Sequence, residues 1–133
     1  MFTLEKIQNA HKKVKSGADF PQYIKDLNAM GVTHYDTFVS DGQSKFYDSS
    51  NDSLDGHPKY PKIKVNEVSS AAHLKLALTT HQQGQTDYFT FCKQAAQAGV
   101  EKWMTDIKGM TVTYLDKDGN KLLVEQIPNP LKK

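Results

Sequence analysis

Cys92, the only cysteine of the chain, is the residue type best suited to nucleophilic chemistry. It lies near the start of a helix that Asp87 is predicted to cap, and the positive end of a helix favours a reactive thiolate. In a similar stretch sixty-eight positions upstream, the matching residue is the apolar Ile24. Because a buried free cysteine packs as a small hydrophobic side chain, we interpret Cys92 as a core residue, with nucleophilic catalysis as the alternative.

Two aromatic residues, Tyr35 and Trp103, could form a stacking platform for the ring of a ligand. Side chains alternate between the two faces of a strand, and one face of each predicted strand is apolar: Tyr35, Thr37 and Val39 in one, Trp103, Thr105 and Ile107 in the other. We interpret this face as packed against helices. The opposite face is expected to meet solvent and carries His34, Asp36 and Lys102.

The five histidines, at positions 11, 34, 57, 73 and 81, lack the spacing of a zinc site. His11 and His81 fall in apolar helical rows, which predicts structural roles. The stretches DSSND (48–52) and DKDGN (116–120) resemble the start of a calcium loop but lack its later glycine and acid. We interpret both as turns, and we predict neither a metal nor another cofactor.

Motifs of known catalytic folds are missing from the sequence. It contains no glycine-rich phosphate loop and no G-x-S-x-G, and its carboxylates are scattered over caps, turns and helix exteriors. No catalytic residue is therefore assigned. Whether the protein is an enzyme stays open at this point, with a non-enzymatic role favoured.

The longest irregular stretch runs from Asp48 to Lys62 and is interrupted by two prolines. Long loops on a rigid scaffold often carry binding residues. The polar candidates for binding a ligand or a partner are Asn51, Asp52, His57, Lys59 and Tyr60. The alternative is an ordinary solvated connection.

Helical periodicity and capping residues predict four helices. They are expected from Thr3 to Ser16-Gly17, from Asp19 to Gly31, from Ser69 or Ser70 to Gly84, and from Thr86 or Asp87 to Gly99. Runs of strand-forming residues predict strands at 32–40, 44–48, 63–68, 100–107, 110–116 and 121–127. The dipeptide Asp41-Gly42 predicts a tight hairpin turn between the first two.

Residues 19–48 align without a gap to residues 87–116. The identical pairs are Asp19/Asp87, Lys25/Lys93, Gly31/Gly99, Val32/Val100, Thr37/Thr105 and Asp48/Asp116. We therefore predict one α+β domain over residues 1–133, built from two tandem units of two helices and a β-hairpin or meander, at about 3–48 and 70–127, related by a pseudo-twofold axis. The alternative is that any helix–strand unit needs an Asp cap and a Gly stop, which explains some of the identities.

All 17 basic residues are lysines, and the net charge is only +2. Arginine supplies the planar group that reads guanine edges and grips phosphate, so we do not expect sequence-specific nucleic-acid binding. No apolar run approaches the roughly 18 residues that span a bilayer, and the N-terminus does not resemble a signal peptide. With one cysteine and no intrachain disulfide, we predict a cytoplasmic protein with no membrane partner.

The stretches VKSGADFPQYIKDLNAMGVTHYDTFVSDG and HQQGQTDYFTFCKQAAQAGVEKWMTDIKGMTVTYLDKDGNKLLVEQIP closely resemble a family of small bacterial and prophage proteins. The family includes YbcV and YdfO and is often labelled "phage envelope protein". The resemblance covers about residues 4 to 128 and implies an α+β domain of bacterial or prophage origin. It implies no catalytic or binding residue, and a lysine-rich chain without a membrane segment does not fit the envelope label.

Two functions from different classes follow. The first is a non-enzymatic binding or interaction module with an unknown protein partner. The second is a protein that binds or sequesters a small molecule, or an enzyme, with a site between the two repeat units. Either could act as a monomer or a homodimer.

Overall fold

The computed structural model describes residues 3–14 and 19–127. Their elements, in chain order, are α1 (Leu4–His11), α2 (Phe20–Met30), β1 (Val32–Phe38), β2 (Ser44–Asp48), β3 (Ser53–Asp55), α3 (Ala71–Gln82), α4 (Tyr88–Gln97), β4 (Val100–Asp106), β5 (Thr111–Asp116) and β6 (Lys121–Gln126). The predicted α+β class is confirmed. We call α1 to β3 the first half and α3 to β6 the second half.

Capping residues start and stop the helices largely as the sequence predicts. The Thr3 side chain accepts a hydrogen bond from the Lys6 N–H, and that of Asp87 accepts one from Thr90 at 2.7 Å. Gly31 ends α2 with φ of +97°, a conformation that only glycine adopts without strain. The first helix stops at His11, earlier than predicted, and its predicted end at Ser16-Gly17 lies outside the described residues.

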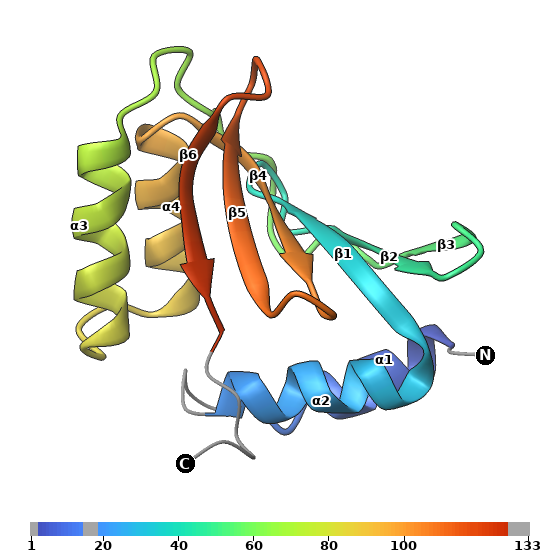
Figure 1. The fold of residues 1–133 in the computed structure, drawn as a ribbon. Helices are drawn as coiled ribbons and strands as arrows, with labels where there is room; N and C mark the ends of the chain where they lie inside the picture. The colour runs from blue at the N-terminus through green and yellow to red at the C-terminus, as the bar shows by residue number, and fades with distance from the viewer. Residues whose placement is uncertain (1–2, 15–18, 128–133) are drawn as a thin grey trace.

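The strands form one antiparallel sheet in the order β3-β2-β1-β4-β5-β6. The two halves therefore meet where β1 pairs with β4 at the centre of the sheet. The helices pack as two pairs, α1 with α2 and α3 with α4 (Figure 1). Rings from α2 contact Tyr35 and rings from α4 contact Trp103, so both pairs cover the same face of the sheet.

The face under the helices holds the core, as predicted for Tyr35 and Trp103, which are 5% and 8% exposed. No helix of the described residues covers the opposite face. His34 and Lys102 lie there half-buried. The expectation that Asp36 meets solvent is wrong, because Lys102 lies 3.5 Å from its carboxylate and leaves the residue 7% exposed.

Two predictions about the connection between the halves are wrong. Residues 63–68 form no strand: Asn66 donates from its backbone to Ala96 and from its side chain to Gln97, which ties the segment to the end of α4. Conversely, the short strand β3 lies inside the stretch predicted as irregular and pairs with β2. Val65 of this segment is buried in the core. Its apolar character therefore reflects packing against the core, and the sequence prediction took it as a sign of a strand.

Gly99 and Gly31 provide a stability test of this packing. Both have positive φ, but a Cβ on Gly99 would lie 2.6 Å from the Ser69 Cα, whereas nothing lies within 4 Å of one on Gly31. We expect Gly31→Ala to cost about 1–2 kcal/mol from backbone strain alone. Gly99→Ala should lower the free energy of unfolding by about 1–3 kcal/mol more, because the new methyl group also overpacks against Ser69. Urea unfolding of both variants measures the difference, and equal losses would contradict the close approach of the 68–69 backbone to α4.

Candidate functional site

The connection after β3 is held against the end of β1 by backbone hydrogen bonds. The N–H groups of Lys59 and Tyr60 both donate to the Asp41 carbonyl, at 2.8 and 3.3 Å, and that of Ile63 donates to Ser40 at 2.7 Å. Gly42 allows this approach, because a Cβ there would lie 2.7 Å from the Tyr60 ring. Two of the sequence-predicted site residues, Lys59 and Tyr60, are thereby brought to the helix-covered side of the sheet.

Tyr60 links this connection to both halves of the protein. Its hydroxyl donates a hydrogen bond to the carbonyl of the buried Val39 at 2.5 Å. Its ring centroid lies 5.0 Å from that of Phe89 on α4. Burial raises the pKa of Tyr60 well above its usual range, so the hydroxyl stays protonated and keeps its donor role.

Cys92 lies beneath these side chains and is completely buried. Its prediction as a core residue is confirmed, but its surroundings are more polar than the apolar Ile24 parallel suggested. Burial raises the pKa of the Cys92 thiol, while the hydroxyls of Tyr60 and Tyr88 and the charge of Lys59 act in the opposite direction. The thiol is therefore protonated at neutral pH, the state in which it is a poor nucleophile.

Lys59 supplies positive charge at this place. Burial lowers its pKa, and its charge in turn lowers the pKa of His11 on α1, which burial has already depressed. The ion pairs of the described residues join Lys102 to Asp36 and Lys117 to Glu67, so Lys59 takes part in neither. Lys59 is nevertheless exposed to solvent, and an ammonium without an acidic partner attracts an anion.

Two exposed aromatic rings of α4 share neighbours with this charge, because Tyr88 and Lys59 both act on Cys92 and Phe89 contacts Tyr60. Tyr88 and Phe89, in the first turn of α4, are 43% and 40% exposed. The Lys93 ammonium lies 5.0 Å from the centroid of the Phe89 ring. The hydroxyl end of Tyr88 lies inward, because it hydrogen-bonds the buried Cys92 and the ring contacts that of Trp103 at 6.4 Å. We name the set His11, Lys59, Tyr60, Tyr88, Phe89 and Cys92 the aromatic–lysine cluster.

The other sequence-predicted site residues lie elsewhere. Asn51 and Asp52 are exposed in the turn between β2 and β3, where Asn51 has φ of +63°, and His57 is exposed in the connection. Sequence reasoning missed His11, Tyr88 and Phe89 as members of a site. Two adjacent aromatic residues in the first turn of a helix were the available signal, because such a pair cannot face the core with both rings.

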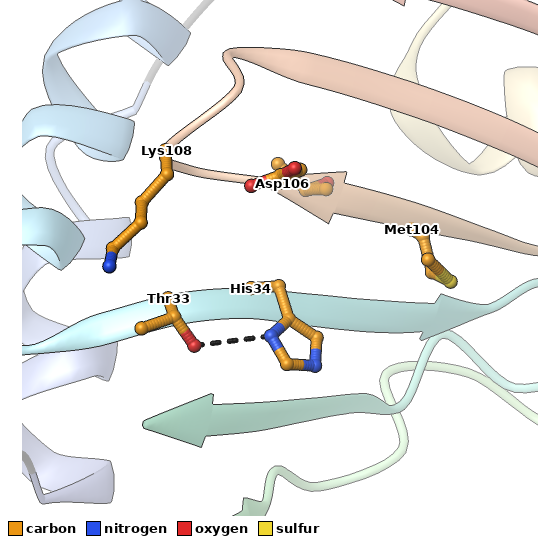
Figure 2. Close-up of a pocket in the computed structure, with 6 residues that line it drawn as sticks. Thr33, His34, Met104, Asp106 and Lys108 are labelled. Carbon is orange, nitrogen blue, oxygen red and sulfur yellow. Dashed lines mark hydrogen bonds between the residues drawn. The ribbon is translucent and has the colours of Figure 1, made fainter. Parts of the chain in front are cut away.

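A second feature is a hollow of about 380 Å³ on the uncovered face, between β1 and β4. Figure 2 shows Thr33 and His34 on β1, Met104 and Asp106 on β4, and Lys108 just after it. The ring of His34 stacks on that of Tyr47 at 4.4 Å, with the planes 9° apart. This stacking holds His34 toward β2 and leaves the space between β1 and β4 open.

A hydroxyl on β1 joins His34 to β2. The Thr33 hydroxyl lies 3.1 Å from the His34 Nδ1 and 3.3 Å from the Tyr47 carbonyl oxygen, so it bridges the two. Within residues 3–14 and 19–127 no three metal-ligating side chains come together, and no helix there could cross a membrane.

Residues 8–126 match a family described as "Protein of unknown function (DUF1398)". The match covers most of the chain, and the protein belongs to this family. The chain is also similar to the uncharacterized protein YcgX of Escherichia coli (strain K12). The two are 22% identical over 122 residues, which cover 92% of this chain and 91% of YcgX.

The burial of Cys92 predicts its reactivity. We expect the thiol of the folded protein to react with Ellman's reagent at pH 8 at least about 100-fold more slowly than in urea, because both access and ionisation are suppressed. Tyr88→Ala removes a side chain that contacts the thiol and should speed the reaction of the folded protein, whereas Leu76→Ala on the exposed side of α3 should not. Fast reaction of the unmodified folded protein would contradict the burial.

Proposed function

We propose that this protein is a non-enzymatic binding module that takes a small anion bearing an apolar ring or chain at the aromatic–lysine cluster. The observation that carries the proposal is Lys59, an exposed cation without an acidic partner in the described residues, which shares the neighbour Cys92 with Tyr88. The rings of Tyr88 and Phe89 are themselves exposed. An anion would pair with the ammonium, and its apolar part would cover the two rings.

The state of Cys92 supports binding over catalysis. A nucleophilic role needs a thiolate, and here burial raises the thiol pKa instead. The residue is also closed off from solvent. Cys92 then has a packing role beneath the proposed site, and a ligand would contact the exposed side chains of Lys59, Tyr88 and Phe89.

We also propose that the two halves derive from one duplicated unit, which would place the cluster at the junction between the units. Strand registers agree at the sixty-eight-residue offset: Tyr35 pairs with Phe46 as Trp103 pairs with Tyr114, and Val32 pairs with Asp48 as Val100 pairs with Asp116. The β1–β2 pair has a register shift directly after Val32, and the β4–β5 pair has one directly after Val100. A cytoplasmic location and a prophage origin remain part of the proposal.

Fluorescent dyes test the proposed ligand class. Anilinonaphthalene sulfonate is an aromatic anion, and N-phenylnaphthylamine is a comparable uncharged dye. We expect Lys59→Met to weaken binding of the sulfonate about tenfold and to leave the neutral dye unchanged, because only the charge is removed. Tyr88→Ala should weaken both dyes, because it removes the apolar contact.

The matched control is Lys25→Met, which removes one positive charge from the exposed side of α2. Equal binding of the sulfonate by the unmodified protein, Lys59→Met and Lys25→Met would overturn the proposal. Native mass spectrometry of protein purified gently from bacteria provides an independent readout. A retained small anion that is lost in Lys59→Met supports the site, and an adduct retained equally by both contradicts it.

Dye affinity should also depend on pH. A sulfonate keeps its charge, so its binding requires only that Lys59 be protonated. Because the pKa of Lys59 is lowered, the amine loses its proton at a lower pH than an ordinary lysine does. We therefore expect affinity to be full near pH 7 and to fall as the pH rises toward 10. In Lys59→Met the same titration should be flat, and a parallel fall in that variant would assign the effect to another group.

A further inference from the structure

We propose that the hollow between β1 and β4 is a second ligand site, which binds a zwitterion: an α-amino acid with an apolar side chain. Two groups of opposite charge, Asp106 and Lys108, line the hollow together with the apolar Met104. The hollow lies on the opposite face of the sheet from the aromatic–lysine cluster. The inference therefore does not depend on the ligand proposed for that cluster.

The pairing of β1 with β4 has two ends that correspond at the sixty-eight-residue offset. Side chains of directly paired residues lie on the same face of a sheet, so the two ends can be compared position by position. Three pairs of the uncovered face run from one end to the other: Phe38 with Lys102, Asp36 with Met104, and His34 with Asp106.

Side chains of the protein itself close the first of these ends. The Lys102 ammonium lies 3.5 Å from the Asp36 carboxylate and 5.8 Å from the centroid of the Phe38 ring. A cation, a carboxylate and an apolar ring thus contact one another within one chain, and Asp36 is only 7% exposed. This end of the pairing is therefore filled, and its two charges are paired.

The second end of the pairing is open and forms the hollow of about 380 Å³. The ring of His34 stacks on that of Tyr47 with centroids 4.4 Å apart, so it lies toward β2 and away from β4 (Figure 2). Each residue type of the filled end is replaced here, because the offset matches Lys102 to His34, Asp36 to Met104 and Phe38 to Asp106.

Both charges at the hollow lack an ionic partner within the described residues. Neither Asp106 nor Lys108 belongs to an ion pair there. The Asp106 Oδ1 atom accepts a hydrogen bond from the Gly109 N–H at 3.1 Å, which fixes the carboxylate at the end of β4. Figure 2 shows the Lys108 side chain extending toward Thr33 and away from Asp106. A carboxylate and an ammonium thus lie apart at one hollow, and each attracts a group of the opposite charge.

The order of the side chains along the chain selects the ligand class. Met104 and Asp106 lie about 6.6 Å apart by the rise of a strand, and Lys108 follows two residues later. The hollow thus offers an apolar, a negative and a positive group in sequence. An α-amino acid carries a side chain, an ammonium and a carboxylate on one carbon atom, and these groups match Met104, Asp106 and Lys108 in turn. A simple anion or cation would use only one of the two charges.

Exposure limits the affinity of this site. Met104 is 37% exposed, and Asp106 and Lys108 are exposed as well. Water screens ionic contacts at such positions, so each of the two contacts strengthens binding by up to about fivefold. We therefore expect a reversible site with a dissociation constant on the order of 1 mM.

Nuclear magnetic resonance titration of the isotope-labelled chain tests the site, with L-leucine as the probe. We expect saturable shifts of the backbone amides of Met104, Asp106 and Lys108. Two matched probes lack one charge each: isocaproate has no ammonium, and isoamylamine has no carboxylate. Both should bind about fivefold more weakly than leucine. Equal affinity for all three probes, or no saturable shift of these amides up to about 20 mM leucine, would overturn the proposal.

Two variants assign the charges of the probe to the two side chains. Asp106→Asn keeps the oxygen that accepts the Gly109 N–H but removes the charge, so it should bind leucine no better than isocaproate. Lys108→Met should bind leucine no better than isoamylamine. The amide spectrum of each variant verifies its fold.

The matched controls make the same changes of charge at exposed positions away from the hollow. They are Asp118→Asn, between β5 and β6, and Lys75→Met on α3. Both should bind leucine as the unmodified chain does. Equal leucine affinity in Asp106→Asn and Asp118→Asn, or in Lys108→Met and Lys75→Met, would reject the hollow as the site.

Discussion

The pairing of β1 with β4 is the constraint on which the rest of the structure depends. It joins the halves in one sheet and fixes the register in which Asp36 pairs with Met104. Because side chains alternate along a strand, that register also puts Tyr35 and Trp103 on one face together. A slip of one residue would turn one of these two aromatic residues away from the helices and expose part of the core. The hydrophobic pattern of both strands therefore selects a single register.

The covered face follows from this register. Tyr23 of α2 meets Tyr35 with ring centroids 6.4 Å apart, and Phe91 of α4 meets Trp103 at 5.9 Å. These contacts place both helix pairs on one face of the central strands. The connection from β3 to α3 contributes Lys59 between the pairs, because its charge acts on His11 of α1 and on Cys92 of α4. The polar groups of the cluster are thus gathered by packing, although they are far apart in the sequence.

The sequence predicts features that depend on short-range physics. The cap at Asp87, the stops at Gly31 and Gly99, and the inward Tyr35 and Trp103 follow from local rules and periodicity. Features that depend on long-range contacts were missed or wrong. The segment 63–68 has the composition of a strand, but its hydrogen-bonding partner is the end of α4 and not another strand. The neighbours of Cys92 likewise come from separate segments, so no spacing could reveal them.

The proposed functional features lie where corresponding positions of the two halves differ. Ile24 in α2 corresponds to Cys92 in α4, whose thiol lies among hydroxyls. On the uncovered face, Phe38 corresponds to Asp106, so one position packs beneath Lys102 and the other borders the hollow. The shared residues maintain the sheet and the helix ends, which leaves the remaining positions free to diverge. On the proposed duplication, a fold with two equivalent halves would acquire a ligand site by changes at a few such positions.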